Sequence, residues 1–175
     1  SSWASPQPGD PGYREAFSVD VDGLPIYTPG MSQAQKVSAA REAALGFFEA
    51  AGFTVSGGMV VAAPAGAKLN YEVIVPGGGT GDHPAYGLLV AAQETLSEIG
   101  ITLDIYDTPD SNVLWDALDN GTQELWTAAW GSAIDPDLYQ VYHSSNTFDQ
   151  PHGTHSNHYY IQDPQLDELI MQARS

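Results

Sequence analysis

The sequence contains no cysteine, so disulfides and thiolate metal sites are excluded. It is also poor in positive charge, with 5 Lys and Arg against 22 Asp and Glu and a formal net charge of −17. Nucleic acids and anionic membrane surfaces are bound through clustered Lys and Arg, so the composition argues against both as partners. Long apolar runs are missing as well, since none approaches the roughly 18 residues that span a bilayer.

A length of 175 residues and a hydrophobic content of 42% are enough for one domain with a core. The chain begins with Ser1-Ser2 rather than Met and ends inside a predicted helix, so we expect a piece excised from a longer protein. Residues 1–33 are rich in Pro and Gly and are expected to form a connecting strap, with a disordered tail as the alternative. Residues 34–175 are expected to form a single α/β lobe.

The first predicted elements are a helix and a hairpin. Ser32 is a suitable N-cap for a helix over about 33–51, whose apolar residues recur at helical spacing. The next segment predicts a β-hairpin with a strand over 59–62, a turn at 64–66 and a return strand from about Lys68.

The second half alternates strands with helices. The pattern predicts strands over 69–75, 101–105 and the apolar stretch from Glu124, and helices over 84–99 and 112–119, with Asp110 or Ser111 as the cap of the second. Right-handed crossovers would make these three strands parallel. A final helix is expected from Asp163-Pro164. The fold class is therefore α/β, with a mostly parallel sheet flanked by helices and a β-hairpin insertion.

The loops that leave the carboxyl ends of parallel strands meet at one edge of the sheet, where open α/β sheets bind ligands. Here these loops are 76–82, 107–110 and 130–137. Trp130 ends the third strand and is expected to contact a ligand, whereas Trp115 and Trp126 are assigned to packing. Asp135 and Asp137 flank Pro136, a sequence that is also typical of an ordinary turn.

The sequence offers little support for catalysis or a cofactor. The glycine-rich loop Gly77–Gly81 lacks Gly-Lys-Ser/Thr, and Asp82 stands where a third glycine of the dinucleotide pattern would fall. Ser132 is not part of a Gly-x-Ser-x-Gly elbow. We therefore expect neither an enzyme nor a bound cofactor. One alternative stays open: His152, His155 and His158 are spaced by three and could capture zinc.

The segment from Trp130 to Ser145, WGSAIDPDLYQVYHSS, resembles the segment that marks bacterial extracellular solute-binding proteins of family 5, the oligopeptide, dipeptide and nickel group. Further stretches resemble the same family in the same order along the chain, namely 43–53, 92–103 and 157–170. Together they cover residues 40–174. The resemblance implies a lobe of the type II periplasmic-binding-protein fold, corresponding to most of the second large lobe, domain III, of a two-lobed receptor.

The resemblance also implies a function. Such receptors deliver peptides to the permease subunits of an ABC importer, as periplasmic proteins or as proteins anchored outside the cell by a lipid. We expect a monomer whose membrane association is limited to such an anchor. The expected ligand-binding residues are Trp130, Gly131, Ser132, Asp135, Asp137 and Tyr139. Many relatives carry an aspartate for the peptide amine where this chain has Ala133, so Asp135 is the candidate replacement. A receptor for a nickel complex or an oligosaccharide is the alternative.

Overall fold

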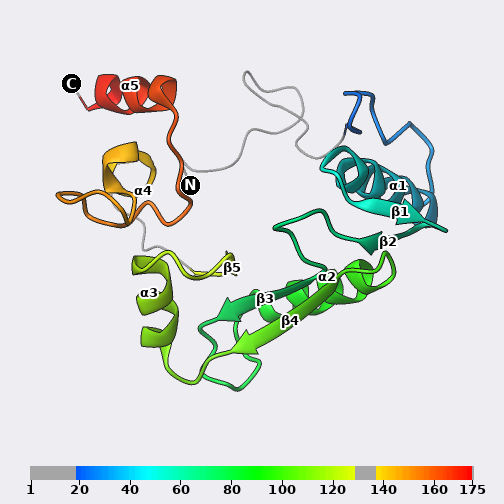
Figure 1. Cartoon of the computed structure of the whole chain (residues 1–175), viewed down its shortest axis with the longest axis horizontal. Helices are drawn as coiled ribbons and strands as arrows, with labels where there is room; N and C mark the ends of the chain where they lie inside the picture. Colours follow the sequence, from blue (N-terminus) through cyan, green and yellow to red (C-terminus); the bar gives the residue numbers. More distant parts are fainter. Residues whose placement is uncertain (1–18, 129–136, 175) are drawn as a thin grey trace. The chain divides into compact units, whose positions relative to one another are not determined.

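The computed structural model describes residues 19–128 and 137–174 (Figure 1). The chain divides into two compact units. One contains the residues up to 70 together with 95–102, and the other contains residues 71–94 together with those from 103 onward. Both β3 (Asn70–Val75) and α2 (Tyr86–Ser97) begin in one unit and end in the other.

The first unit is built on a capped helix. Helix α1 (Gln33–Ala50) begins at Ser32, whose side chain accepts a hydrogen bond from the Gln35 N–H while the Gln35 side chain accepts from the Ser32 N–H. This reciprocal arrangement satisfies two N–H groups that the first turn leaves without helical partners. The rings of Phe48 and Phe53 then meet edge to face with centroids 5.1 Å apart, which holds the exit from the helix. The predicted helix and its cap are confirmed.

The predicted hairpin is wrong in its pairing. Strand β1 (Thr54–Ser56) pairs antiparallel with β2 (Met59–Ala62), through a two-residue turn at Gly57 and Gly58. Both glycines have positive φ, 61° and 75°, which is the conformation that a tight hairpin turn of this hand requires. The hairpin turn is therefore this glycine pair and not the predicted one at 64–66. The strand that follows Lys68 joins the parallel sheet instead.

The hairpin is attached to the segment after α2 by a close backbone contact. The N–H of Val60 donates to the carbonyl of Ile99 at 2.7 Å, and Val60 and Ile99 are each only 2% exposed. Gly100 follows with φ 89°, and a Cβ at this position would overlap the Val60 carbonyl. Glycine is therefore required here both by the backbone angle and by the close approach of β2.

The second unit contains the central sheet, in the order β4-β3-β5. Besides β3, its strands are β4 (Thr102–Asp107) and β5 (Leu125–Trp126). Strand β5 pairs parallel with β3, with Val73 opposite Leu125 and Ile74 opposite Trp126. The arrows of β3 and β4 point the same way in Figure 1, and the Thr108 N–H donates to the Val75 carbonyl where both strands end. The predicted parallel arrangement is confirmed.

Five helical segments complete the described chain after β3. Helix α2 is followed by α3 (Ser111–Asp119), α4 (Tyr139–Tyr142), the 3-10 turn η1 (Ser144–Asn146) and α5 (Pro164–Ala173). Asp110 caps α3 and Asp163 caps α5, each through its carboxylate. No helix in residues 19–128 and 137–174 combines the length and apolar character needed to cross a membrane.

The core of the second unit lies where α3 meets the middle strand of the sheet. Leu114 and Leu118 of α3 pack with Ile74 of β3, at exposures of 0%, 3% and 3%. Burial of one such side chain stabilises the fold by roughly 1.5–3 kcal/mol. Trp115 and Trp126 are partly buried against this cluster, as expected for packing residues.

Residues 143–162 are organised by buried asparagines rather than by apolar side chains. Asn146 is 1% exposed; its Nδ2 donates to the Tyr139 carbonyl at 2.8 Å, and its Oδ1 accepts from the Thr154 N–H at 3.0 Å. Asn157 is also 1% exposed, and its amide bridges to the backbone N–H and carbonyl of Ile161. These amides replace the backbone pairing that regular structure would supply. The segment is therefore well anchored although its sequence shows no periodic pattern.

Gly100→Ala should lower the free energy of unfolding by more than about 1 kcal/mol, because a side chain would be placed at positive φ against the Val60 carbonyl. Gly87→Ala is the matched control. Gly87 lies within α2, and a Cβ added there would meet no atom within 4 Å, so alanine should raise stability by up to about 1 kcal/mol. Urea unfolding of both variants measures the two effects, and equal values would contradict the proposed contact.

Candidate functional site

The carboxyl edge of the parallel sheet is the candidate site. Two of the three predicted exit loops, 76–82 and 107–110, are described, whereas residues 129–136 are not. The expected ligand residues Trp130, Gly131, Ser132 and Asp135 therefore lie outside the described residues. Asp137 and Tyr139 are described and lie in the second unit.

The glycine-rich loop closes around an internal carboxylate. Asp107, the last residue of β4, accepts a hydrogen bond from the Gly81 N–H at 2.7 Å through Oδ2. Oδ1 is buried and accepts no hydrogen bond of standard geometry from the described residues. The Gly81 N–H, followed by those of Gly79 and Gly77 and by the nearby His83, holds the pKa of Asp107 below its usual value.

This contact explains why the loop is rich in glycine without being a phosphate site. The Gly81 N–H, which could otherwise face a phosphate, is directed at a carboxylate that the protein itself supplies. The loop also bonds to the next exit loop, because the Gly78 N–H donates to the Thr108 carbonyl at 3.0 Å. Its role in the structure is to fasten together the ends of β3 and β4.

A row of aromatic rings begins at the end of β5. The Trp126 and Tyr159 rings have centroids 5.0 Å apart, and Tyr159 stacks on Tyr142 at 5.6 Å with an interplanar angle of 9°. We call Trp126, Tyr159 and Tyr142 the aromatic row. Tyr159 is 45% exposed, so the row presents ring surface to solvent as well as packing internally. From the sequence, Trp126 is assigned only to packing and both tyrosines are missed, because Tyr142 and Tyr159 reach the row from distant parts of the chain.

His158 lies between two indoles, one of which, Trp126, belongs to the aromatic row. Its ring centroid is 6.0 Å from those of both Trp115 and Trp126. Its Nδ1 is buried with no hydrogen-bond partner in the part of the chain that the structure describes. Burial lowers the pKa of His158, and the charge of Asp119 opposes this only in part. The imidazole therefore acts as a neutral packing group.

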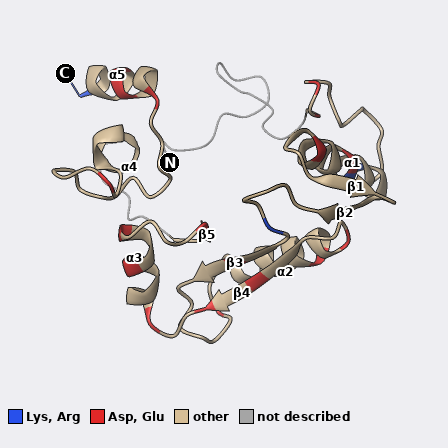
Figure 2. Cartoon of the chain, viewed as in Figure 1, with Lys and Arg blue, Asp and Glu red and all other residues tan. Residues whose placement is uncertain are grey.

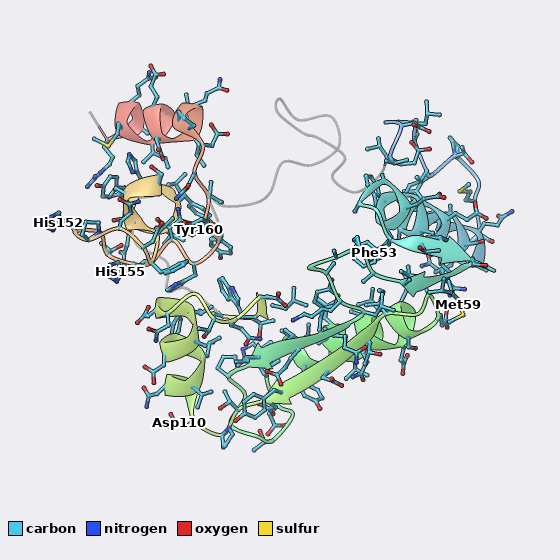
Figure 3. All side chains as sticks on the ribbon, viewed as in Figure 1. Phe53, Met59, Asp110, His152, His155 and Tyr160 are labelled. Carbon is cyan, nitrogen blue, oxygen red and sulfur yellow. The ribbon has the colours of Figure 1, made fainter. Side chains whose placement is uncertain are left out.

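Two residues of the 143–162 segment have strained backbone angles. His155 and Tyr160 adopt φ of 58° and 56°, a region that residues other than glycine seldom occupy. Side-chain hydrogen bonds hold both: His155 Nε2 donates to the Gln150 carbonyl at 2.9 Å, and the Tyr160 hydroxyl donates to Asp149 at 2.6 Å. The Thr147 and Tyr160 hydroxyls in turn lower the pKa of Asp149. These hydrogen bonds stabilise the loop at His155 and Tyr160, both labelled in Figure 3.

Asp137 already has partners within the chain. Its Oδ1 accepts from the Tyr139 N–H at 2.9 Å, and its Oδ2 lies 3.3 Å from the Arg174 Nε. The Arg174 guanidinium also stands over the Tyr139 ring, 4.3 Å from its centroid. Asp137, Tyr139 and Arg174 thus fasten the start of α4 to the end of α5. The arginine of this group was not expected from the sequence.

The three histidines considered for zinc do not form a common site. His155 donates to the Gln150 carbonyl and His158 packs between indoles, while His152 is exposed (Figure 3). Within residues 19–128 and 137–174, no three His, Cys, Asp or Glu side chains are grouped so as to hold a metal ion. The zinc hypothesis based on residues 152–158 therefore has no geometric support.

A serine, a histidine and an aspartate also come together, but not as a catalytic triad. Ser145 Oγ lies 3.0 Å from His143 Nδ1, and Asp167 Oδ1 lies 3.9 Å from the same nitrogen. In a triad the carboxylate orients the histidine through the ring nitrogen opposite to the one that faces the serine. Here the serine and the carboxylate both face Nδ1, so the cluster lacks the arrangement of a catalytic triad.

A scan against protein-family models finds no match, and a search of curated proteins finds none either. Solved structures do match. NikZ from Campylobacter jejuni, in complex with Ni(L-His), matches 79% of this chain at 21% identity with a TM-score of 0.55. The oligopeptide-binding protein AppA from Bacillus subtilis, in complex with a nonapeptide, matches 84% at 18% identity with a TM-score of 0.57.

This chain has the fold of a solute-binding-protein lobe. The sequence motifs resemble the oligopeptide, dipeptide and nickel group, and the match to NikZ and to the oligopeptide-binding protein AppA confirms that resemblance at the level of the fold. The expected α/β class with a parallel sheet flanked by helices is confirmed as well. The chain spans only 26% and 28% of the lengths of these two neighbours.

Asp107→Asn should loosen the glycine-rich loop, because the amide removes the negative charge that the loop N–H groups face. We expect faster amide hydrogen exchange at Gly79 and Gly81, measured by NMR. Asp104→Asn is the control, since Asp104 is an exposed residue of the same strand and the same charge is removed. Unchanged exchange in the Asp107 variant would contradict the proposed role of this carboxylate.

His158→Phe should remove a pH dependence of stability. The pKa of His158 in the folded chain is below its ordinary value of 6.5, so the unfolded chain takes up this proton first as the pH falls. The stability is therefore fully present above the unfolded pKa and is lost as the pH falls toward the folded pKa, by at most about 1.4 kcal/mol per pH unit. Phenylalanine keeps the ring contacts without titrating. Urea unfolding at about pH 8 and about pH 5 checks this; a variant as pH-sensitive as the parent would contradict it.

Proposed function

We propose that the chain is part of the substrate-binding component of an ABC importer and that it binds oligopeptides. The observation that carries the proposal is the carboxyl edge of the parallel sheet, where β5 ends at the aromatic row and the Tyr159 ring is exposed. Ligands of open α/β sheets bind at this edge. The fold that the chain shares with AppA, an oligopeptide-binding protein, supports the same function.

The chemistry of this edge suits a peptide of varied sequence. Aromatic side chains such as Tyr159 offer contact area that tolerates many ligand side chains. The net charge of −17 favours the positively charged amino terminus of a peptide over anionic solutes. Few basic residues surround the site, as Figure 2 shows, and Arg174 is the only Lys or Arg in residues 71–94 and 103–175.

We infer that Asp135, rather than Asp137, is the anchor for the peptide amine. The carboxylate of Asp137 already accepts a hydrogen bond from the Tyr139 N–H and pairs with Arg174, so a ligand amine would have to compete with both contacts. In this proposal Asp137 and Tyr139 have a structural role, at the contact between the start of α4 and Arg174. Trp130, Gly131 and Ser132 complete the proposed ligand contacts.

A chelated metal is the second candidate ligand, because NikZ was solved in complex with Ni(L-His). A metal that arrives with its own ligands does not require three protein donors. Among the described residues no three His, Cys, Asp or Glu side chains are grouped to hold a metal ion, and a chelated metal does not need such a group.

In this proposal the chain acts without catalysis, as the 34–175 lobe of a monomeric two-lobed receptor joined to the rest of the protein by the 1–33 strap. The receptor would work in the periplasm or, through a lipid anchor outside this sequence, on the outer face of the cell membrane. Its partners would be the ligand and the permease subunits of the importer.

The test uses the complete receptor and isothermal titration calorimetry with a panel of peptides. Asp135→Ala should weaken binding by roughly 3–5 kcal/mol, the usual effect of leaving a buried charge without its partner. Asp137→Ala is the matched control. It removes the same charge two residues away and should leave peptide affinity nearly unchanged.

The same titration separates the two candidate solutes. Binding of peptides, with no response to nickel and histidine added together, supports the peptide receptor. Tight binding of the nickel–histidine mixture with no response to peptides would replace it with the chelate receptor. Equal losses in the Asp135 and Asp137 variants would show that Asp135 is not the specific anchor.

A further inference from the structure

A polar pocket lies in the second unit, formed by η1, the start of α5 and the residues just before α5. Its volume is about 370 Å³, within the range of small-molecule sites. Its lining consists of Ser144, Ser145, Gln150, Gln162, Pro164 and Asp167. Five of these six side chains are polar, and the family resemblance assigned a ligand role to none of them.

Asp167 is the only charged residue in this lining, and the pocket holds it firmly. Its Oδ1 accepts from the Ser144 N–H at 2.9 Å and its Oδ2 from the Ser144 hydroxyl at 2.6 Å. Burial tends to raise the pKa of Asp167, but the two Ser144 groups and His143 outweigh it, so the pKa is lowered. The carboxylate therefore stays charged, and its side chain is still 20% exposed.

The remaining groups that line the pocket can accept hydrogen bonds from a donor on a ligand. The Ser144 hydroxyl gives its hydrogen to Asp167 and keeps its lone pairs as acceptors. Gln150 and Gln162 add amide oxygens. No lysine or arginine lines the pocket. The set thus combines one negative charge with several neutral acceptors.

The walls of the pocket are fixed before any ligand arrives. Ser144 and Ser145 belong to the η1 turn, which the buried Asn146 ties to the Tyr139 carbonyl. On the other wall, Pro164 and Asp167 belong to the first turn of α5, which Asp163 caps through two backbone N–H groups. A ligand would therefore lose little free energy to ordering these side chains.

We propose that this pocket binds the primary ammonium group of a small polar amine. A primary ammonium offers three N–H donors and one positive charge, which matches one carboxylate surrounded by neutral oxygen acceptors. This binding does not depend on the function proposed above, because every group it uses lies in residues 143–167. The carrier is either a free small amine or the amino terminus of a peptide, which share this chemistry.

The experiment titrates the 175-residue chain with ethanolamine and follows backbone and side-chain amides by NMR. We expect saturable shifts confined to Ser144, Ser145, Gln150, Gln162 and Asp167. Choline and ethylene glycol are the matched ligands. Choline keeps the charge without any N–H donor and ethylene glycol lacks the charge, so each should bind at least about tenfold more weakly.

Two variants of α5 remove the same charge at neighbouring positions. Asp167→Asn should weaken ethanolamine binding at least about tenfold, whereas Glu168→Gln, outside the pocket lining, should leave it unchanged. If Asp167→Asn fails to fold, Gln162→Lys provides the test. A tethered ammonium would then occupy the pocket beside an intact Asp167 and abolish binding.

Several outcomes would overturn the proposal. Equal weakening in the Asp167 and Glu168 variants would mean that net charge alone attracts the amine, and binding retained in Gln162→Lys would place the amine elsewhere. A final comparison uses a dipeptide and its N-acetylated form. Tighter binding of the free dipeptide than of ethanolamine identifies a peptide amino terminus as the carrier, and the reverse order identifies a small amine.

Discussion

The parallel pairing of β3 with β4 on one side and β5 on the other is the constraint on which the rest of the second unit depends. Because all three strands run the same way, their exit loops leave from one edge of the sheet. The carboxylate of Asp107 then joins two of those loops by accepting a hydrogen bond from the Gly81 N–H. The aromatic row begins at Trp126, at the end of β5. Reversal of a single strand would move its exit loop to the opposite edge and separate these groups.

Polar groups stabilise this unit where a larger apolar core would do so elsewhere. The apolar cluster is small, and Asn146 and Asn157 are as deeply buried as its leucines. Their amides satisfy backbone groups that no strand or helix pairs, which anchors residues 143–162 although η1 is the only regular element among them. The consequence for function is a set of preorganised polar walls. Pockets and platforms built on such walls need little rearrangement to receive a ligand.

Acidic charge is spread over α1, α3 and α5, as Figure 2 shows, yet several of the carboxylates have structural partners. Asp110 and Asp163 cap helices, Asp107 holds a loop, and Asp137 pairs with Arg174. Proximity to the proposed site is therefore not enough to identify a carboxylate as a ligand anchor. Asp167 differs because its two hydrogen-bond donors are the neutral N–H and hydroxyl of Ser144, and no lysine or arginine lines its pocket.

The sequence by itself determined the elements with strong local signals. The cap at Ser32, the helix over α2, the strands β3 and β4 and the start of α5 at Pro164 all follow from periodicity and capping, which act within a few residues. The hairpin turn was predicted in the wrong place because both 57–58 and 64–66 have sequences typical of a turn. Only the observed pairing of β1 with β2 shows which of them forms the hairpin. Tertiary structure alone decided the aromatic row, the Asp107 contact and the Asp167 pocket. Each joins residues far apart in sequence, and no local pattern records which distant side chains a fold will bring within hydrogen-bonding or stacking distance.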